Sequence, residues 1–182
     1  MSEQTIQDNL YSIPVTILDK YTCLSLGATT INDLIKTGKL KSVKVSKNLS
    51  KKPDVLIINK NKEVVVFLEF KTPQELNTQA KIDKAIKQEI SVAQEIGAKI
   101  YVVTDGDKYI WLNPTTGNLI TDENGTPIIR KIDPKAEPKK LAEFIDLVSL
   151  SVSSENDTIL RLEDIDPTDL AKKIARILKR MT

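Results

Sequence analysis

The 182-residue sequence contains no histidine and a single cysteine, Cys23. Without histidine, the chain cannot form a Ser-His-Asp or Cys-His catalytic group or use a histidine base. One cysteine allows neither an internal disulfide nor a Cys-x-x-Cys metal site, and such a residue is most often a small buried hydrophobe. Any acid, base or metal chemistry must therefore come from Asp, Glu, Lys or Tyr side chains.

Long hydrophobic runs are also missing. No stretch approaches the roughly 18 uninterrupted apolar residues that span a membrane, and the first residues, Met1 to Gln4, lack the basic and apolar regions of a signal peptide. The 40% hydrophobic and 29% charged content is typical of a globular domain with a real core. We therefore expect a cytoplasmic protein with no membrane partner.

Acidic residues are absent from one basic stretch, although the net charge of the chain is only +2. Between Lys36 and Lys52 there are seven lysines, at positions 36, 39, 41, 44, 47, 51 and 52. One interpretation is a solvated edge strand whose lysines discourage aggregation. The other is a surface that binds nucleic-acid phosphates, and this interpretation gains weight because the run ends two residues before Asp54. It predicts Lys44, Lys47, Lys51 and Lys52 as DNA ligands.

Hydrophobic periodicity and turn residues predict alternating helices and strands. The expected elements are a helix near 29–37, strands near 40–46, 55–58 and 63–71, a helix at 73–96, and strands near 99–104 and 109–112. The helix at 73–96 has Thr72 as N-cap, Pro73 at its first position and Glu75 to complete a capping box. The strands at 55–58 and 63–71 flank the polar turn 59–62 and should form a hairpin.

The chain changes character after two prolines, Pro134 and Pro138. An amphipathic helix is expected at 139–151, a polar linker at 153–157 and a basic helix from Asp166 onward. We therefore divide the chain into a domain at 1–133, with its core at about 29–112, and a helical extension at 134–182. One interpretation of this extension is a connection to a further domain of a longer protein.

Three charged residues interrupt the apolar hairpin: Asp54 before its first strand, and Glu69 and Lys71 near the end of its second. If 59–62 is a four-residue loop, Ile58 pairs with Glu63 and Asp54 lies opposite Phe67. Because strand side chains repeat every two residues, the three charged groups then share one face at one end of the hairpin. Buried charges are costly unless paired, hydrated or metal-bound, so they either neutralise one another or hold a ligand.

Two carboxylates that converge on one point repel each other, and a cation keeps both ionised. Carboxylate oxygens with open positions for water suit Mg²⁺, with Mn²⁺ as a substitute, so Asp54 and Glu69 are predicted metal ligands. The backbone carbonyl of Phe70 is a candidate third ligand. A metal in this position can activate water for attack on a phosphodiester. Lys71 can position or activate that water, or offset charge on the phosphorane.

Pro53-Asp54, fourteen intervening residues and then Glu69-Phe70-Lys71 resembles the motif of the PD-(D/E)XK nuclease superfamily. Within it, the chain looks most similar to the N-terminal nuclease domain of type I restriction enzyme R subunits and of related single-chain restriction-modification enzymes. Their pattern continues with a Gln-bearing helix, an apolar strand ending in Thr-(Asn/Asp)-Gly and an aromatic strand. Here these features correspond to Gln88, Thr104-Asp105-Gly106 and Tyr109-Ile110-Trp111. The resemblance covers roughly residues 29–112.

The resemblance implies an α/β fold with a restriction-endonuclease-like mixed central sheet, an α-β-β-β-α-β core and added C-terminal helices. It implies Mg²⁺-dependent cleavage of double-stranded DNA in a restriction-modification system, with catalytic roles for Asp54, Glu69, Lys71 and Gln88. Methyltransferase and specificity domains or subunits are the implied protein partners. The related Gln-x-x-x-Tyr motif places tyrosine where this chain has Val92. Two alternatives remain: a catalytically silent nuclease-fold module for DNA binding or subunit interaction, and a small-molecule or peptide-binding α/β domain.

Overall fold

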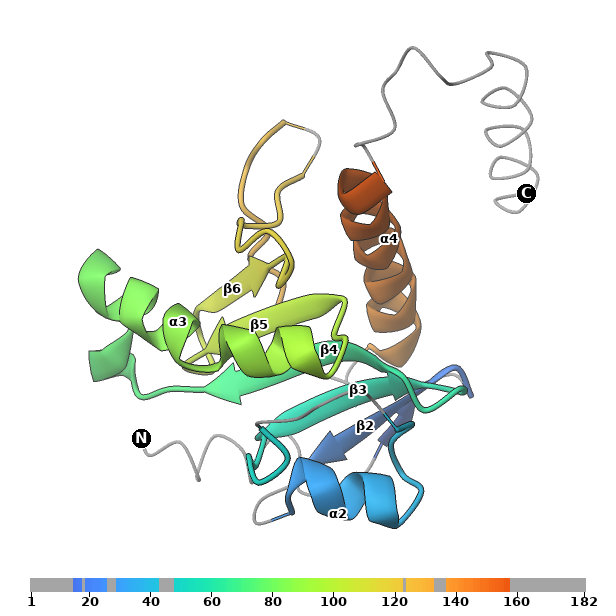
Figure 1. The fold of residues 1–182 in the computed structure, drawn as a ribbon. Helices are drawn as coiled ribbons and strands as arrows, with labels where there is room; N and C mark the ends of the chain where they lie inside the picture. The colour runs from blue at the N-terminus through green and yellow to red at the C-terminus, as the bar shows by residue number, and fades with distance from the viewer. Residues whose placement is uncertain are drawn as a thin grey trace, which may run out of the picture. The chain divides into compact units, whose positions relative to one another are not determined.

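A six-stranded mixed sheet, whose strands follow one another in chain order, forms the centre of the fold (Figure 1). The computed structural model describes residues 15–17, 19–25, 29–42, 48–122, 124–132 and 137–157. The strands are β1 (Val15–Ile17), β2 (Tyr21–Ser25), β3 (Val55–Asn59), β4 (Val64–Phe70), β5 (Ile100–Thr104) and β6 (Tyr109–Leu112). All neighbouring pairs are antiparallel except β4 and β5, which are parallel. The sheet is therefore mixed, as the sequence predicts.

Helices cover both faces of this sheet. They are α2 (Ile31–Lys36), α3 (Gln79–Glu95) and α4 (Pro138–Asp157), and a short 3₁₀ helix, η1 (Pro73–Glu75), precedes α3. Strand β4 is buried on both faces because its side chains alternate between two clusters. On one face, Leu68 and Trp111 belong to the same cluster as Ile145 of α4. On the other, Phe67 and Tyr101 lie in a cluster that includes residues of α2 and α3.

The helix predicted at 73–96 begins later than expected. The Glu75 carboxylate accepts hydrogen bonds from the backbone N–H and the hydroxyl of Thr72, at 3.0 and 2.7 Å, but these contacts cap only η1. Leu76 is then fully buried, and Thr78 acts as a second N-cap from which α3 starts at Gln79. The prediction of one continuous helix was therefore wrong, because a second capping residue, Thr78, follows the first by six residues and starts a new helix.

The hairpin of β3 and β4 has a different register from the predicted one. Val55 lies opposite Leu68, whereas Ile58 lies opposite Val64, and a β-bulge separates these pairs. The predicted pairs of Ile58 with Glu63 and of Asp54 with Phe67 were wrong. The turn is one residue shorter than assumed, with the Asn59 N–H donating to the Glu63 carbonyl at 3.0 Å, and this shifts the register by one residue. The bulge accommodates an extra residue on β4 and shifts it by one more. Near Asp54 the shift amounts to two residues, an even number. Asp54 therefore keeps the predicted face, now level with Glu69.

A strand from the N-terminal region lies next to β3. This strand, β2, pairs with β3 in antiparallel register from Tyr21 opposite Asn59 to Ser25 opposite Val55. The predicted strand at 40–46 falls largely on residues 43–47, which lie outside the described residues, and 40–42 belong to no strand. The described residues thus show the expected helix at 31–36 and the strands β3, β4 and β5, and β2 adds a strand that the predicted core lacked.

The C-terminal helix α4 extends beyond the predicted bounds of 139–151. Its inward side chains join the cluster on one face of the sheet, and they are Leu141, Ala142, Ile145, Val148 and Val152. The basic helix predicted from Asp166 lies outside the described residues, and the domain division at 133 stays a prediction. In the described part of the chain, no helix combines the length and hydrophobicity needed to cross a bilayer.

Candidate functional site

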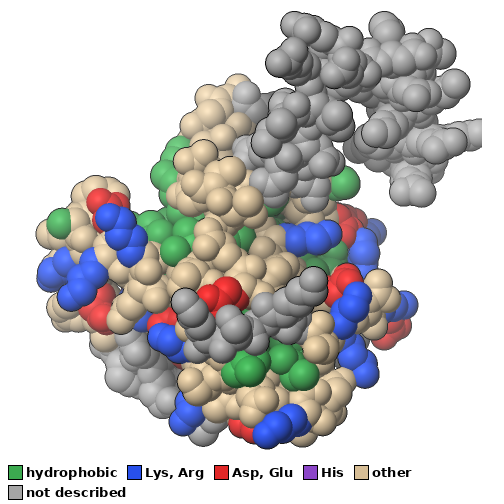
Figure 2. All heavy atoms as spheres, in the orientation of Figure 1, with side chains coloured by type: hydrophobic (Ala, Val, Ile, Leu, Met, Phe, Trp, Pro, Cys, Tyr) green, Lys and Arg blue, Asp and Glu red, His purple; other side chains and the backbone are tan. Residues whose placement is uncertain are grey.

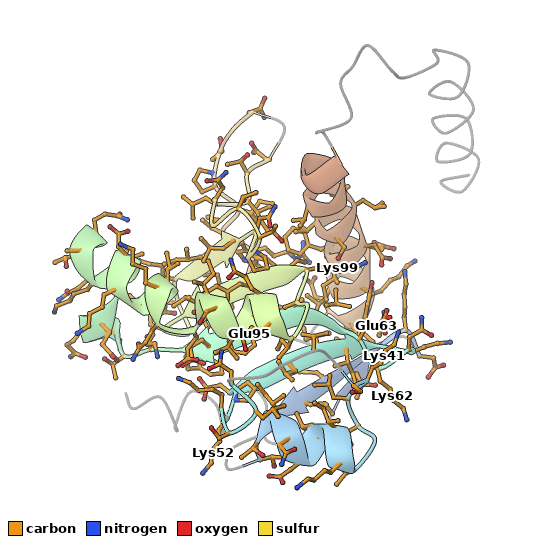
Figure 3. All side chains as sticks on the ribbon, viewed as in Figure 1. Lys41, Lys52, Lys62, Glu63, Glu95 and Lys99 are labelled. Atoms are coloured by element: carbon orange, nitrogen blue, oxygen red, sulfur yellow. The ribbon has the colours of Figure 1, made fainter. Side chains whose placement is uncertain are left out.

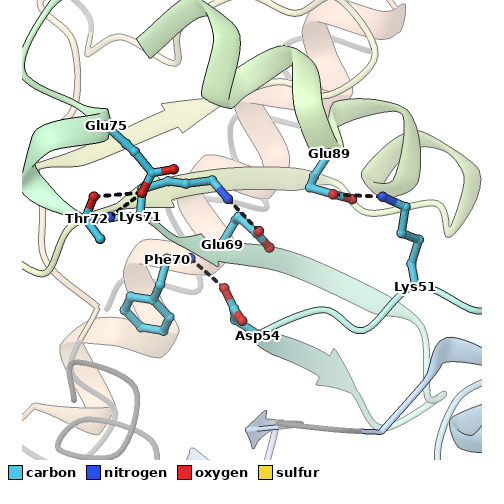
Figure 4. A network of polar contacts seen from close by, with 8 residues as sticks. All are labelled: Lys51, Asp54, Glu69, Phe70, Lys71, Thr72, Glu75 and Glu89. Atoms are coloured by element: carbon cyan, nitrogen blue, oxygen red, sulfur yellow. Dashed lines mark hydrogen bonds and ion pairs between the residues drawn. The ribbon is translucent and has the colours of Figure 1, made fainter. Parts of the chain in front are cut away.

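Asp54 and Glu69 meet at the end of the β3–β4 hairpin that is farther from its turn (Figure 4). Asp54 lies directly before β3, and its Oδ2 accepts a hydrogen bond from the backbone N–H of Phe70 at 2.8 Å. Glu69 is the next-to-last residue of β4 and lies opposite Val103 in the parallel pair with β5. Residues far apart in the sequence are thus held together by sheet hydrogen bonds, as the hairpin argument predicts.

Lys71 completes this group from the position just after β4. Its side-chain Nζ donates a hydrogen bond to Glu69 Oε1 at 2.9 Å, and only 8% of the side chain is exposed. Its backbone N–H donates to the carbonyl of Thr104 at 2.8 Å, which extends the β4–β5 ladder by one residue. Lys71 is therefore held by hydrogen bonds from both its backbone and its side chain, and its ammonium group directly contacts one of the two carboxylates.

Phe70 contributes through its backbone, because its ring is buried in the cluster on the opposite face of the sheet. Its N–H points toward Asp54, as the hydrogen bond shows. In an antiparallel ladder the N–H and C=O of one residue point to the same neighbouring strand. The carbonyl oxygen of Phe70 therefore lies on the edge of β4 that faces Asp54, the position required of the predicted third metal ligand.

The Thr104-Asp105-Gly106 segment forms a hydrogen-bonded turn at the end of β5, next to the site. Asp105 Oδ1 accepts a hydrogen bond from the backbone N–H of Lys108 at 2.7 Å, and Thr104 Oγ1 accepts one from Gly106 at 2.9 Å. The Nζ of Lys108 then donates to the carbonyl of Leu76 at 2.7 Å. This chain of contacts joins the turn after β5 to Leu76, in the segment after η1.

The two carboxyl groups are held in an environment that disfavours their charge. Burial raises the pKa of Glu69 from 4.5 to about 8, with a further contribution from the nearby Asp54 charge. Burial also raises the pKa of Asp54, although the Phe70 N–H and the Lys71 charge oppose this effect. Raised values on two adjacent carboxyls mean that the site lacks enough positive charge to keep both ionised. A divalent cation would supply that charge.

The donor set fits a hard divalent cation with open coordination positions. Asp54 and Glu69 provide carboxylate oxygens and Phe70 a carbonyl oxygen, and Mg²⁺ is commonly held by one or two carboxylates with water completing its octahedron. Within the described ranges, no group of three or more Asp, Glu, Cys or His side chains is arranged to hold a metal ion. A cation here would therefore depend on two carboxylates, one backbone oxygen and water.

This arrangement predicts that Mn²⁺ binding depends steeply on pH. Metal binding must displace the proton that Glu69 carries below its pKa of about 8, so each pH unit below that value should weaken the apparent affinity up to tenfold. Calorimetric titrations should show an affinity about 50-fold higher at pH 8, where half of Glu69 is already ionised, than at pH 6. An affinity that does not change between these pH values would contradict the assignment of Glu69 as a ligand.

The metal-free fold should show the opposite trend. Because the pKa of Glu69 is higher in the folded chain, at about 8, than its ordinary 4.5, the folded state binds more protons between these values. The Glu69 contribution to stability is therefore present below pH 4.5 and is lost as pH rises toward 8. Chemical denaturation in EDTA should show this slope in the wild type. Glu69→Gln, which cannot ionise, is the control in which it is reduced.

Glu89 is a further acidic residue at the site that the sequence analysis missed. It lies on α3 four residues after Ala85 and three before Val92, both of which are buried against the sheet. Its Oε1 accepts from Lys51 Nζ at 3.0 Å, and 15% of its side chain is exposed. Its charge contributes to the raised pKa values of Asp54 and Glu69. Glu89 thus extends the acidic site from the sheet to the helix above it (Figure 4).

Gln88 and Asp33 have no described contact with Asp54 or Glu69. The side chain of Gln88 is exposed on α3, one residue before Glu89, and its catalytic role stays a prediction. Asp33 is the first acidic residue of the region that resembles the nucleases, residues 29–112. It belongs to the N-terminal capping box of α2, where its Oδ2 accepts a hydrogen bond from the Thr30 hydroxyl at 2.6 Å. An Asp33 carboxylate committed to this capping box is not a member of the site formed by Asp54 and Glu69.

The predicted DNA-binding lysines divide into two groups. Lys44 and Lys47 lie outside the described residues, whereas Lys51 and Lys52 are both exposed on the segment that leads to Asp54. Lys51 is tied to Glu89, so the basic segment directly borders the acidic site. Lysines on α3 are exposed as well, at positions 81, 84 and 87. Basic and acidic side chains gather over the first part of this helix (Figure 2).

A second group of lysines surrounds a hollow at the opposite end of the strands. The hollow has a volume of about 410 Å³ and is lined in part by Lys41, Lys62, Glu63 and Lys99. Lys41 Nζ donates to Glu63 Oε1 at 2.8 Å. Figure 3 shows these residues at one end of the sheet and Lys52 at the other. The second group therefore provides matched controls for lysines next to the acidic site.

Comparison with known proteins gives one structural neighbour. No protein-family profile and no curated protein matches the sequence. Among solved structures, the chain is similar to the type IIG restriction endonuclease BpuSI, with 19% sequence identity and a TM-score of 0.32. The similarity covers 70% of this chain and 16% of the BpuSI chain, so this sequence corresponds to a small part of that protein's length.

Proposed function

We propose that this chain is a Mg²⁺-dependent DNA endonuclease domain of a restriction-modification system. The observation that carries the proposal is the convergence of Asp54 and Glu69 at one end of a hairpin, with the Lys71 ammonium 2.9 Å from Glu69. Two carboxylates, an adjacent amine and no histidine limit the acid–base chemistry to these groups. Metal-assisted hydrolysis of a phosphodiester is a reaction that this set of groups supports.

Each residue of the site has a separate role in this proposal. Asp54, Glu69 and the carbonyl of Phe70 would hold the ion, which when bound lowers the pKa of water and stabilises charge on the phosphodiester oxygens. The Phe70 N–H fixes the orientation of Asp54. Lys71, buried beside Glu69, orients the attacking water as an ammonium or, in its neutral amine form, takes up its proton. Mn²⁺ has the same preference for oxygen ligands and should substitute.

A catalytically silent module is the second candidate function. In the absence of metal, Glu69 is already paired with Lys71 and Asp54 is already hydrogen-bonded to Phe70. If this network is only structural, calorimetry should detect no Mn²⁺ site that Asp54→Asn removes. If the proposed function is correct, the wild type should bind Mn²⁺ and nick supercoiled plasmid DNA in Mg²⁺, and Asp54→Asn should abolish both.

The basic segment before Asp54 is proposed to bind the DNA backbone. Neutralising Lys51 and Lys52 together should weaken the affinity for double-stranded DNA and reduce the slope of log affinity against log salt by about 2, since each phosphate contact contributes about 0.9. Fluorescence anisotropy at several salt concentrations measures both quantities. The matched control replaces Lys62 and Lys99 at the far end of the sheet. Equal losses in the two double variants would contradict a specific role for Lys51 and Lys52.

Partner domains or subunits complete the proposal. The resemblance to nuclease domains of restriction-modification enzymes suggests that methyltransferase and specificity functions belong to other domains or to separate subunits. This chain would then cut DNA at places that its partners select. The proposal predicts little sequence preference for the isolated chain, which mapping the cleavage ends on plasmid DNA would test.

A further inference from the structure

Tyr101 has a buried hydroxyl group without a hydrogen-bond partner among the described residues. Tyr101 is the second of the five residues of β5 and is fully buried, with 0% of its surface exposed. Buried hydroxyls are nearly always hydrogen-bonded, because a hydroxyl removed from water without a partner destabilises the fold. Phenylalanine would fill the same space without this cost. The hydroxyl therefore suggests a role that the metal-free fold does not use.

The sheet register places this hydroxyl beneath the acidic site. Tyr101 lies opposite Phe67 and Val103 lies opposite Glu69, so the side chains of Tyr101 and Glu69 are on the same face, two residues apart along the strand direction. The rings of Tyr101 and Phe67 are in contact, with their centroids 5.5 Å apart. The phenol thus belongs to the layer between the sheet and α3, the layer that also contains Glu69.

Carboxylates surround the phenol within this layer. Glu89 projects from the face of α3 that carries the buried Ala85 and Val92, and these two residues share a cluster with Tyr101. Burial, and then the charges of Glu69, Glu89 and Asp54, hold the pKa of Tyr101 far above its usual value. The hydroxyl consequently remains protonated at any working pH. It is a hydrogen-bond donor placed among acceptors.

We propose that Tyr101 is a positioning residue whose hydroxyl donates a hydrogen bond to the Glu69 carboxylate when Glu69 binds a divalent cation. Without metal, Glu69 directs Oε1 to Lys71. Carboxylates that bind metals are themselves held by hydrogen bonds, and these second contacts set the orientation of the ligand and the affinity of the site. Tyr101 is the buried donor next to Glu69 that is not yet engaged. This inference rests on the proposed metal-dependent function.

The test compares Tyr101→Phe with Tyr109→Phe in the full 182-residue chain. Tyr109 is also buried, at 3% exposure, but lies in the cluster on the opposite face of the sheet. Two quantities are measured: the melting temperature in EDTA and the Mn²⁺ dissociation constant by calorimetry. Tyr101→Phe should melt at the same or a higher temperature than the wild type, because an uncompensated polar group is removed. Its Mn²⁺ affinity should fall about 10- to 100-fold, whereas Tyr109→Phe should bind Mn²⁺ like the wild type.

The possible outcomes separate this inference from the proposed function. If the wild type binds Mn²⁺ and Tyr101→Phe binds it equally well, the positioning role is wrong and the metal site stands. If Tyr101→Phe melts at a lower temperature in EDTA, the hydroxyl already stabilises the metal-free fold and the inference fails. If the wild type shows no Mn²⁺ site that Asp54→Asn removes, both the proposed function and this inference fail.

Discussion

Replacing Asp54 by asparagine, or Glu69 by glutamine, is expected to lower Mg²⁺-dependent nicking of plasmid DNA by about 10³-fold or more. Both substitutions preserve side-chain shape, and an asparagine at 54 can still accept the hydrogen bond that Phe70 donates at 2.8 Å. They remove the negative charge that would hold the cation. Because no third Asp, Glu, Cys or His side chain completes a metal-holding group among the described residues, we expect no other carboxylate to compensate for either loss.

The control for these two variants is Glu63→Gln. Glu63 lies just before β4, at the other end of the hairpin, where it pairs with Lys41 and 42% of its side chain is exposed. It should nick DNA like the wild type. Melting curves in EDTA establish that all three variants fold. Full nicking activity in both Asp54→Asn and Glu69→Gln would exclude the proposed metal site. Loss of activity in Glu63→Gln would show that removing a carboxylate far from the site has the same effect, so that the losses at Asp54 and Glu69 could not be assigned to metal binding.

The convergence of Asp54, Glu69 and Lys71 could be predicted from the sequence because strand geometry is local. Two apolar strands joined by a short polar turn determine which side chains share a face. The predicted register was wrong by two residues near Asp54, because the turn is one residue shorter than assumed and the β-bulge between Ile57 and Ile58 leaves no clear signal in an apolar run. The site survived this error because an even shift preserves the face.

Glu89 was missed because the apolar stripe predicted for this helix runs mainly through isoleucines. The isoleucines at 82, 86 and 90 suggested the inward stripe, but they are only partly buried. The close contact with the sheet is made by smaller residues, Ala85, Val92 and Ala93. Glu89 lies between them on this side of the helix. Alanines eight positions apart, with an acid midway, were the signal available in the sequence.

Contacts between distant segments were the other limit of the sequence analysis. Strand β2 is five residues long, and its pairing with β3 joins positions that lie at least 30 residues apart in the sequence, from Ser25 with Val55 to Tyr21 with Asn59. Nothing in its local composition specifies that partner. The layer that holds Tyr101 depends similarly on the parallel pairing of β4 and β5 across the whole of α3. Periodicity therefore predicted the helices and strands and which of their side chains share a face. Which strands pair, and which helix packs on each face, could be learned only from the structure.

Replacing Lys71 by methionine is expected to separate metal binding from catalysis. The variant should lose nicking activity by about 10²- to 10⁴-fold, the usual contribution of a positioned acid–base group. Its Mn²⁺ affinity should equal or exceed that of the wild type, because the ammonium group 2.9 Å from Glu69 Oε1 no longer competes for that oxygen. Methionine also suits the site, where only 8% of the lysine side chain is exposed. Nicking assays and calorimetric Mn²⁺ titrations measure the two effects.

Lys81→Met provides the matched control, since Lys81 is an exposed lysine on α3 whose Nζ contacts only a backbone carbonyl, that of Gln74, at 2.8 Å. It should change neither quantity appreciably. If Lys71→Met keeps wild-type nicking, Lys71 has no chemical role and water must be activated without it. If the variant loses Mn²⁺ binding together with nicking, Lys71 acts by building the site. Only retained metal binding with lost cleavage places the Lys71 side chain in the chemical step, because the site would then still hold its cation while the attacking water lacks the group that orients it or, as a neutral amine, takes up its proton.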